Sequence, residues 1–459
     1  MKKMALILFA ASAFAQSSKY VSVSTPRVIL EHVEVIDGTG AAPILDRNMV
    51  IENGRIAAIV AGADLPKADG TTVIDLRGSA VMPGIIGMHD HLYYFAFPNL
   101  AADRSFERPF VQLEMVFSGP RLYLANGVTT IRTTGTYDPY AELRLKRDIE
   151  SGAAPGPHLD VTGPYLDNMT PGEARQTVAF WADRGATSFK AYKNISRDAL
   201  RAAIDEAHKR GLKVTGHLCS VTYEEAANLG IDNLEHGFFV NTALDPDKKP
   251  DTCSAAEGDY TLEHMSAADA DRLIANLVQH HVAITSTYLS TAFAVAGHEP
   301  QLRPAVLQAM APSARDAYLY WRNRVSTPNN AALLLRKDMD LERAFVAAGG
   351  LLLAGPDPVG IAGIVPGFSD HREIELLVEA GFSPVEAIRI ATLNGATFLG
   401  RQDRIGSIAV GKNADLLVVK GDPATRITDI ENVTIVFKDG VGYDPQKLLD
   451  SARGHYGEY

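Results

Sequence analysis

The chain has 459 residues, of which 46% are hydrophobic and 22% charged, and its formal net charge is -11. This composition is typical of a globular protein that is long enough for a full-sized core and a second, smaller domain. The acidic balance, with no basic block, argues against nucleic acid and anionic membranes as partners. We therefore expect a small-molecule partner. The sequence leaves open whether the chain forms a homo-oligomer.

The first residues have the three-part pattern of a secretory signal. Lys2 and Lys3 precede an apolar stretch that begins at Met4, and small residues stand at Ala13 and Ala15. The apolar stretch is shorter than the roughly 20 residues that cross a bilayer, which argues against the alternative of a membrane anchor. Residues 1–15 are thus predicted to be a signal peptide cleaved after about Ala15, and the protein to be periplasmic or secreted.

Both ends of the remaining chain are rich in β-strand signals. Apolar and polar residues alternate in short runs that are broken by Gly-containing turns, within residues 20–40, 48–60, 71–84, 406–423 and 433–440. The simplest arrangement joins the two ends. We therefore predict a small discontinuous β-sandwich domain built from residues 19–83 and 401–442.

Between these ends, strand-like runs alternate with helical ones. The strand candidates are residues 84–91, 127–135, 157–166, 186–192, 213–218, 232–237, 282–289 and 350–358. Helix signals stand between them; residues 196–211 open on a capping Ser and close on Gly, and residues 266–281 again open on Ser. This alternation predicts an α/β fold, with residues 84–400 forming a closed (β/α)8 TIM-type barrel.

Residues that bind metals stand where several of these strands end. Catalytic residues of such barrels lie at the carboxyl ends of the strands, so these side chains should meet at one mouth. The set is His89 and His91 after the first strand, Lys190 in the fourth, His217 after the fifth, His236 after the sixth and Asp357 after the eighth. Four imidazoles and a carboxylate are ligands that zinc and similar divalent ions prefer.

With these motifs the chain resembles the amidohydrolase superfamily of metal-dependent hydrolases. The likeness rests on the His-x-His, the single His residues of the fifth and sixth strands, the Asp of the eighth, and the closing "GSIAVGKNADLLVV". It implies two divalent metal ions, zinc above all: His89, His91 and Asp357 would hold one, and His217 and His236 the other. It also implies that Lys190, carbamylated by carbon dioxide, bridges the two ions.

Strand alternation separates Lys190 from the nearby Lys193. In "SFKAY", Ser188, Lys190 and Tyr192 share one face, whereas Lys193 lies on the other. Lys193 is therefore the weaker candidate for the bridge. The alternative for Lys190 is an ordinary lysine whose ammonium reaches solvent at the strand end.

The resemblance is closest to the branch of Xaa-Pro dipeptidases and imidazolonepropionase-like enzymes. It implies hydrolysis of an amide or peptide C–N bond in a dipeptide or an N-acyl amino acid by a metal-bridging hydroxide. Asp357 would be the general base, and Tyr192 would donate to the oxyanion. Arg132, Tyr192 and His371 are the candidates for binding substrate. Two alternatives remain: an imidazolonepropionase-like cyclic amide hydrolase or deaminase with one metal, and an inactive binding protein on the same fold.

Two further features stay open at the level of sequence. Cys219 and Cys253 are the only cysteines, and they could form a disulfide near the barrel mouth in an oxidising compartment. The segment from about Ala292 to Lys337 is longer than an ordinary connection. Because it carries the aromatic residues 318, 320 and 321, it is either a lid over the mouth or a surface excursion.

Overall fold

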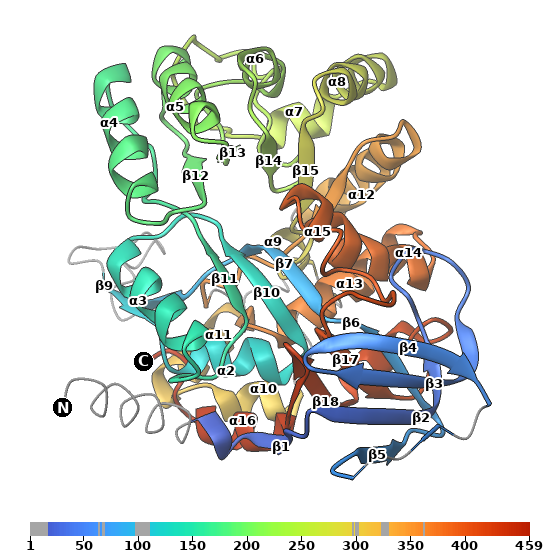
Figure 1. Ribbon diagram of the computed structural model, residues 1–459. Helices are drawn as coiled ribbons and strands as arrows, with labels where there is room; N and C mark the ends of the chain where they lie inside the picture. Colours follow the sequence, from blue (N-terminus) through green and yellow to red (C-terminus); the bar gives the residue numbers. More distant parts are fainter. Residues whose placement is uncertain are drawn as a thin grey trace, which may run out of the picture.

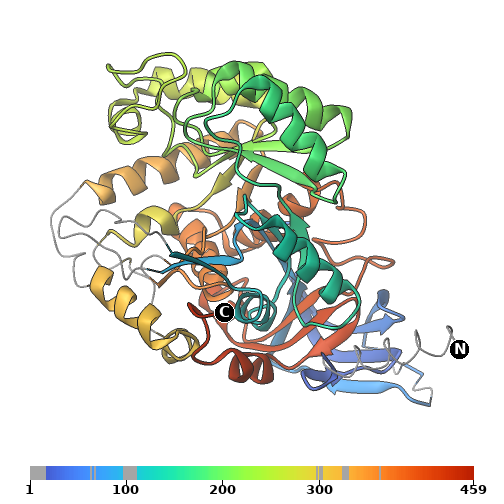
Figure 2. The ribbon, with the colours of Figure 1, turned by 90° about the vertical axis from the view of Figure 1, so that its left-hand side faces the viewer.

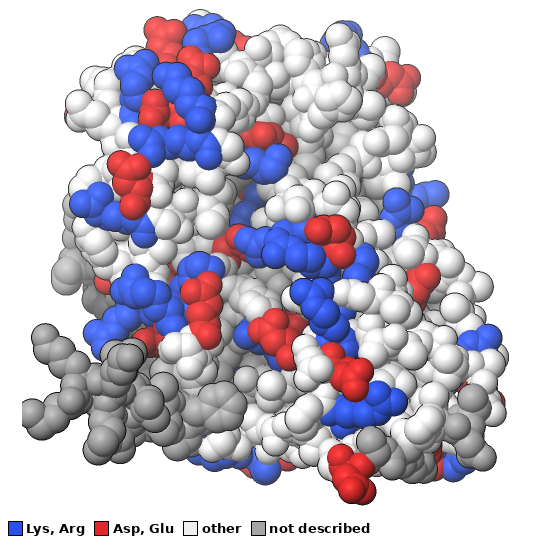
Figure 3. Space-filling view, viewed as in Figure 1, with Lys and Arg blue, Asp and Glu red and all other residues white. Residues whose placement is uncertain are grey.

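The computed structural model describes residues 17–62, 65–66, 69–96, 111–295, 298, 303–322, 330–360 and 363–459 (Figure 1). The predicted signal peptide, residues 1–15, lies outside these ranges. Within them, every helix is too short or too polar to cross a bilayer. On the face in Figure 3, basic and acidic side chains are intermingled, without a large area of one sign.

Strands lie within all eight of the predicted strand ranges of the central segment. They are β7 (Ile85–Asp90), β10 (Val128–Thr133), β11 (His158–Val161), β12 (Ser188–Ala191), β13 (Lys213–Gly216), β14 (Asn233–Glu235), β15 (Ala283–Ser286) and β16 (Leu352–Ala354). All their pairings are parallel. The α/β class expected from the alternation is confirmed.

The hydrogen-bond ladders divide these strands into two parallel sheets. One sheet has the order β11-β10-β7 and the other the order β12-β13-β14-β15-β16. An isolated bridge between Thr162 and Ser188 links them on one side, and the Asp357 amide donates to the His89 carbonyl (3.0 Å) on the other. At the second junction a Cβ on Gly355 would lie 2.2 Å from the His89 nitrogen, so glycine is required for this close approach. The ladders therefore do not close into the single barrel sheet expected from the sequence.

Helices follow most of these strands and cover their outer side. They are α2 (Ser118–Ala125), α3 (Pro139–Glu150), α4 (Pro171–Ala182), α5 (Arg197–Lys209), α6 (Tyr223–Leu229), α7 (Asp259–His264), α8 (Ala267–Gln279), α12 (Ala331–Ala347), α13 (Phe368–Ala380), α14 (Pro384–Arg389) and α15 (Gly395–Phe398). The predicted Ser caps are confirmed, because Ser196 accepts from the Ala199 amide and Ser266 from the Asp269 amide. A π-helical turn, Ile390–Asn394, joins α14 to α15.

The two ends of the chain share one nine-stranded sheet beside the parallel strands (Figure 1). Its strands are β1 (Val21–Val23), β2 (Arg27–Val35), β3 (Ile44–Glu52), β4 (Arg55–Ala61), β5 (Thr72–Asp75), β6 (Ser79–Pro83), β17 (Leu416–Lys420), β18 (Val433–Lys438) and β19 (Val441–Tyr443). The antiparallel pairing of β6 with β17 connects the amino-terminal strands to the carboxyl-terminal ones.

This sheet differs from the predicted sandwich because its strands are all joined by hydrogen bonds. The first half of β2 pairs with β5 and its second half with β6, on the same edge. A register shift between Leu30 and Val33, with φ +59° at His32, bends β2 between the two halves. The fork lets the sheet fold around its own hydrophobic cluster, which includes Leu30, Val33 and Phe437. One branched sheet thus takes the place of two separate ones.

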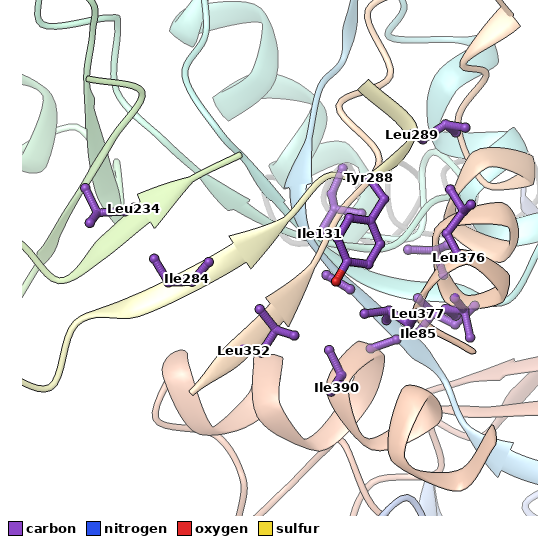
Figure 4. Close-up of a cluster of buried hydrophobic side chains, with 14 of the residues drawn as sticks. Ile85, Ile131, Leu234, Ile284, Tyr288, Leu289, Leu352, Leu376, Leu377 and Ile390 are labelled. Carbon is purple, nitrogen blue, oxygen red and sulfur yellow. The ribbon is translucent and has the colours of Figure 1, made fainter. Parts of the chain in front are cut away.

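The main core lies between the parallel strands and their helices (Figure 4). Leu234, Ile284 and Leu352 are register neighbours on β14, β15 and β16, and all three are fully buried. The alternate residues form a polar ladder instead: the Asn233 amide contacts the Thr285 hydroxyl at 3.0 Å, and the Thr215 hydroxyl donates to Asn233 at 3.1 Å. The sheet therefore packs its apolar face against helices and keeps polar groups on the other.

The segment from about Ala292 to Lys337 begins at the end of α9 (Leu289–Ala292) and contains α10 (Pro304–Ala309), α11 (Pro312–Arg322) and the start of α12; its residues 296–297, 299–302 and 323–329 lie outside the described part. Tyr318 is 2% exposed and belongs to a cluster with Tyr94 and Tyr456. Tyr94 lies in a hairpin of β8 (Tyr93–Ala96) and β9 (Val111–Glu114). The carboxyl-terminal helix α16 (Pro445–Ala452) packs on α2 and contacts α10 (Figure 2). The described part of this segment is thus anchored to the chain end.

A truncation that leaves a cavity in the main core should lower the free energy of unfolding more than the same truncation at the surface. We expect Leu352→Ala to lower the free energy of unfolding by about 2–5 kcal/mol, because the site is closely packed on the helix side. The matched control is Leu45→Ala, where the side chain is 66% exposed. Urea unfolding followed by circular dichroism measures both. Equal losses would contradict this account of the core.

Candidate metal centre

The His-x-His of β7 brings two imidazoles to one carboxylate. His91 Nε2 lies 3.0 Å from Asp357 Oδ1, and His89 Nε2 lies 3.6 Å from the same oxygen. Both histidines are at most 1% exposed, whereas the Asp357 side chain is 21% exposed. Asp357 adopts φ +57°, an uncommon backbone conformation for a residue other than glycine. This strained turn after β16 directs the carboxylate to the end of β7.

His236 and His217 lie beside this group. The ring of His236 is 4.5 Å from that of His89 and 4.4 Å from that of His217, measured between centroids. His236 Nδ1 is 3.0 Å from the Thr287 hydroxyl, while its Nε2 is buried without a hydrogen-bond partner. A buried imidazole nitrogen without a partner is costly unless it binds a ligand.

Lys190 joins the same cluster from β12. Its ammonium nitrogen lies 3.0 Å from His89 Nε2, and the residue is 2% exposed. Lys193 instead pairs with Glu257 at 2.8 Å and is partly exposed. The strand alternation read from the sequence therefore agrees with the positions of the two lysines.

Burial sets the protonation of these groups. It lowers the pKa of all four imidazoles, to about 4 for His236, so that they are neutral at pH 7 and able to bind a metal. Burial also lowers the pKa of Lys190 to about 8, which raises its fraction of neutral amine. Although burial raises the pKa of Asp357, the adjacent His89 and His91 hold it well below its usual value. The cluster thus combines neutral nitrogen donors with an anionic oxygen.

Glu235 is a buried residue of the centre that sequence reasoning missed. Its carboxylate lies 2.8 Å from His89 Nδ1 and 2.8 Å from the guanidinium of Arg132. It immediately precedes His236, whose φ of +64° breaks the alternation, so that both side chains reach the same region. The "LEHG" motif contained this residue, but ordinary strand alternation would have placed it on the opposite face. Carboxylates that hold the second nitrogen of a metal-binding histidine fix its orientation.

Arg132 and His371 are not brought to the open side of the centre. Arg132 is 1% exposed, donates to the Met88 carbonyl at 2.8 Å and pairs with Glu235. His371 is fully buried on α13, where its Nε2 contacts the Asn126 carbonyl at 2.7 Å. Both side chains are held by internal partners, although Arg132 Nη1 and His371 Nδ1 are buried without one. These positions argue against the substrate-binding roles predicted for them.

A wall of tyrosines stands beside the cluster, and of these only Tyr192 was predicted. Its ring is 5.0 Å from His217 and 4.9 Å from Tyr165. Tyr93 is 4.6 Å from His91, and its hydroxyl is 2.6 Å from that of Tyr165. Tyr137 contacts both Tyr93 and Tyr165 at about 5 Å. Each tyrosine follows the end of a parallel strand by a few residues. That position in the sequence could have indicated the other three.

Cys219 and Cys253 form a disulfide, with their Cα atoms 4.8 Å apart. The bond the sequence left open is thus present. Cys219 follows His217 by two residues, and Cys253 lies in the connection between β14 and α7. The disulfide therefore ties that connection next to the His217 end of the centre.

The residues fit a metal centre on this geometry. One ligand atom each from His89, His236 and Asp357 lie within 4.8 Å of one another, and His236 Nε2 is buried without a partner. Donors of this kind suit zinc and other divalent transition ions. His91, His217 and Lys190 surround the group through the contacts described above.

Comparisons with known proteins agree with this site. Residues 80–442 match the amidohydrolase family, so the chain belongs to the amidohydrolase family of metal-dependent hydrolases. An imidazolonepropionase of Micrococcus luteus is 25% identical over 402 residues, which cover 84% of this chain and 90% of that protein.

Solved structures share the fold. A Xaa-Pro dipeptidase with bound methionine in its active site has a TM-score of 0.67 at 20% identity, covering 91% of this chain and 100% of that one. An ochratoxinase from A. niger has a TM-score of 0.65 at 17% identity, covering 95% and 100%. At these identities the likeness establishes the fold alone.

Glu235→Gln should weaken metal binding although Glu235 is not among the predicted ligands. The amide carries no charge to support His89 Nδ1, and loss of such a partner lowers metal affinity about 10–100-fold. Competition with a chromophoric chelator measures the affinity. Glu224→Gln, on the exposed side of α6, is the control and should leave it unchanged. Unchanged affinity in Glu235→Gln would contradict the orienting role.

Breaking the disulfide should loosen the connection it ties. We expect Cys253→Ser to raise KM more than it lowers kcat, because the ligands stay in place while the adjacent connection gains freedom. Thiol titration of the unfolded, unreduced wild-type protein should find no free thiol. Two free thiols would show that the bond is absent in the purified protein.

Proposed function

We propose that this chain is a binuclear metal-dependent hydrolase that cleaves the amide or peptide C–N bond of a small substrate, of the Xaa-Pro dipeptide or N-acyl amino acid type. The observation that carries the proposal is the contact of Lys190 with His89 at the centre of the cluster, together with the lowered pKa of that lysine. A neutral amine can add carbon dioxide and lose a proton to become a carbamate, which is an anionic ligand. A buried ammonium among imidazoles would otherwise repel a cation.

The six side chains would divide between two zinc ions. His89, His91 and Asp357 would hold one ion, His217 and His236 the other, and the Lys190 carbamate both. Bound there, the ions would supply an activated water and polarise the carbonyl group under attack. Asp357, which reaches solvent on one side, would take the proton of the water and pass it to the leaving nitrogen. Tyr192 would donate a hydrogen bond to the oxyanion.

The tyrosine wall supports a substrate with an apolar or ring-containing group. Tyr93, Tyr165 and Tyr192 present aromatic surface next to His91 and His217. A pyrrolidine ring or an acyl chain would pack there while the scissile bond lies at the metals. The fold likeness to a Xaa-Pro dipeptidase agrees with this class.

The second candidate is an imidazolonepropionase-like cyclic amide hydrolase or a deaminase with one metal. The similarity to the M. luteus imidazolonepropionase over most of both chains favours it. A single metal would leave Lys190 without a role, which is why we prefer the binuclear centre. Metal analysis and a substrate panel of dipeptides, N-acyl amino acids and cyclic amides distinguish the two.

Three aspects of organisation belong to the same proposal. The two parallel sheets would act as one (β/α)8 barrel of residues 84–400. The Thr162–Ser188 bridge supports this at one junction, and the hydrogen bond from the Asp357 amide to the His89 carbonyl supports it at the other. Residues 19–83 and 401–442 would be the composite β-domain. Residues 1–15 would direct export, and the disulfide supports this, because such bonds persist in oxidising compartments.

Lys190→Ala tests the bridge. We expect loss of most activity and of one bound metal, and partial recovery on adding acetate or propionate at high concentration, because a free carboxylate can occupy the vacated space. Metal analysis and initial rates measure both. Loss of activity without any response to added acid would contradict a carbamate at this position.

Lys193→Ala is the matched control for the same experiment. Its ammonium pairs with Glu257 away from the cluster, so activity and metal content should stay near those of the wild type. If Lys193→Ala removed a metal while Lys190→Ala did not, the assignment of the bridging lysine would be wrong.

Asp357→Asn tests the general base. An amide can still contact a metal through its oxygen but cannot accept the proton, so kcat should fall on the order of 10²–10⁴-fold while part of the metal stays bound. Full activity in the variant would overturn the proposed function. So would wild-type protein that binds no stoichiometric metal and hydrolyses nothing after loading with zinc, manganese or cobalt.

A further inference from the structure

A second group of potential metal ligands lies at the opposite end of the parallel strands. His158 is the first residue of β11, whereas the residues of the metal centre described above follow the carboxyl ends of their strands. Asp415 immediately precedes β17, and Asp439 stands in the turn between β18 and β19. The three residues therefore meet where the nine-stranded sheet joins the parallel strands.

The distances within this group are too long for good hydrogen bonds but suit a shared ion. His158 Nε2 lies 3.6 Å from Asp415 Oδ2 and 3.4 Å from Asp439 Oδ2, and one atom of each residue falls within 4.8 Å of the others. Ligands at 2.0–2.2 Å from a tetrahedral zinc are roughly 3.3–3.6 Å apart. The observed separations match this spacing.

One carboxylate oxygen is directed into the group without a partner. Asp415 Oδ1 accepts from the Asp439 amide at 2.7 Å, which fixes the carboxylate, while Asp415 Oδ2 is buried and makes no hydrogen bond. The Asp415 side chain is only 3% exposed. The Asp439 side chain is 51% exposed, so solvent can supply a further ligand.

The charges around the group favour a divalent cation when His158 is neutral. Two carboxylates face one ammonium, that of Lys438, which lies 3.2 Å from Asp439 Oδ2. On β11, Asp160 is neutralised by Arg401, and on β19 the Tyr443 phenol is close to Asp439. With His158 neutral, Asp415, Asp439 and Lys438 together carry a net charge of one negative unit.

A proton on His158 competes with such an ion. Burial lowers the pKa of His158, but the nearby carboxylates of Asp415 and Asp439 raise it above its usual value overall. Below that pKa the imidazolium is held between the carboxylates, and above it the nitrogen is free to bind.

We propose that His158, Asp415 and Asp439 form a structural site for a divalent transition ion such as Zn²⁺, which clamps the carboxyl-terminal strands of the nine-stranded sheet to β11. Water completes the coordination on the side of Asp439. The site is separate from the proposed hydrolase centre and does not depend on it.

The test counts bound metal. Full-length protein is dialysed against excess Zn²⁺ at pH 8, freed of unbound ion and analysed for zinc per chain. We expect His158→Gln and Asp439→Asn each to bind one equivalent less than the wild type, with unchanged hydrolase activity. Asp439 lies in a half-exposed turn, so its variant should fold even if the His158 variant does not.

His208→Gln is the matched control. His208 Nε2 forms an ordinary 3.0 Å contact with Asp232 on the surface, a histidine–aspartate pair without a second carboxylate at that distance. Its zinc content should equal that of the wild type. If the Asp439 variant also binds as much zinc as the wild type at pH 8, the group is an ion pair held by a proton and the proposed site does not exist.

Discussion

The buried carboxylate of Glu235 is the constraint on which the rest of the metal centre depends. It stands between a guanidinium and an imidazole, with no exposure to water, and the Thr215 hydroxyl also donates to it. An ionised group in such a place is costly unless its partners are fixed. Because Arg132 is in turn held by the Met88 carbonyl, the ends of β7, β10 and β14 are fastened together below the ligands. Glu235 thus fixes the position of the His89 ring, and Lys190, His236 and Asp357 contact the ring in that position.

Backbone strain completes this arrangement at two points. His236 and Asp357 both have positive φ; His236 directly follows β14, and Asp357 comes three residues after the end of β16. Such conformations cost of order 1–3 kcal/mol each and persist where the surroundings enforce them. At His236 the strained turn sends Glu235 and His236 to one region, so that one motif supplies both a candidate ligand and the group that orients another. At Asp357 it carries the chain from β16 to within hydrogen-bonding distance of β7.

The sequence predicted the strands and the helix starts of the central segment because both follow from local pattern. Alternation in residues 186–192 separated Lys190 from Lys193, and the capping Ser196 and Ser266 marked real helix starts. It failed where tertiary context overrides local pattern. Their positions after strands suggested Arg132 and His371 as substrate contacts, but internal acceptors hold both side chains. Glu235 was missed because the positive φ of His236, which breaks the strand alternation, is a property of the folded backbone. The fork of β2 was missed because the two halves of this strand pair with different neighbours.

Histidine and carboxylate groups meet at both ends of the parallel strands, but the two environments demand different chemistry. At the carboxyl ends, burial keeps the imidazoles neutral, and a lysine with a lowered pKa stands among them, which favours a centre that changes protonation during a reaction. At the amino end of β11, carboxylates raise the pKa of His158, and no tyrosine wall or disulfide-tied connection lies against it among the contacts described. At that end β11 meets the carboxyl-terminal strands of the nine-stranded sheet, so an ion or a proton there would hold the two sheets together. On these two proposals, the same residue types would serve reactivity at one end and attachment at the other, because the neighbours of each histidine set its pKa.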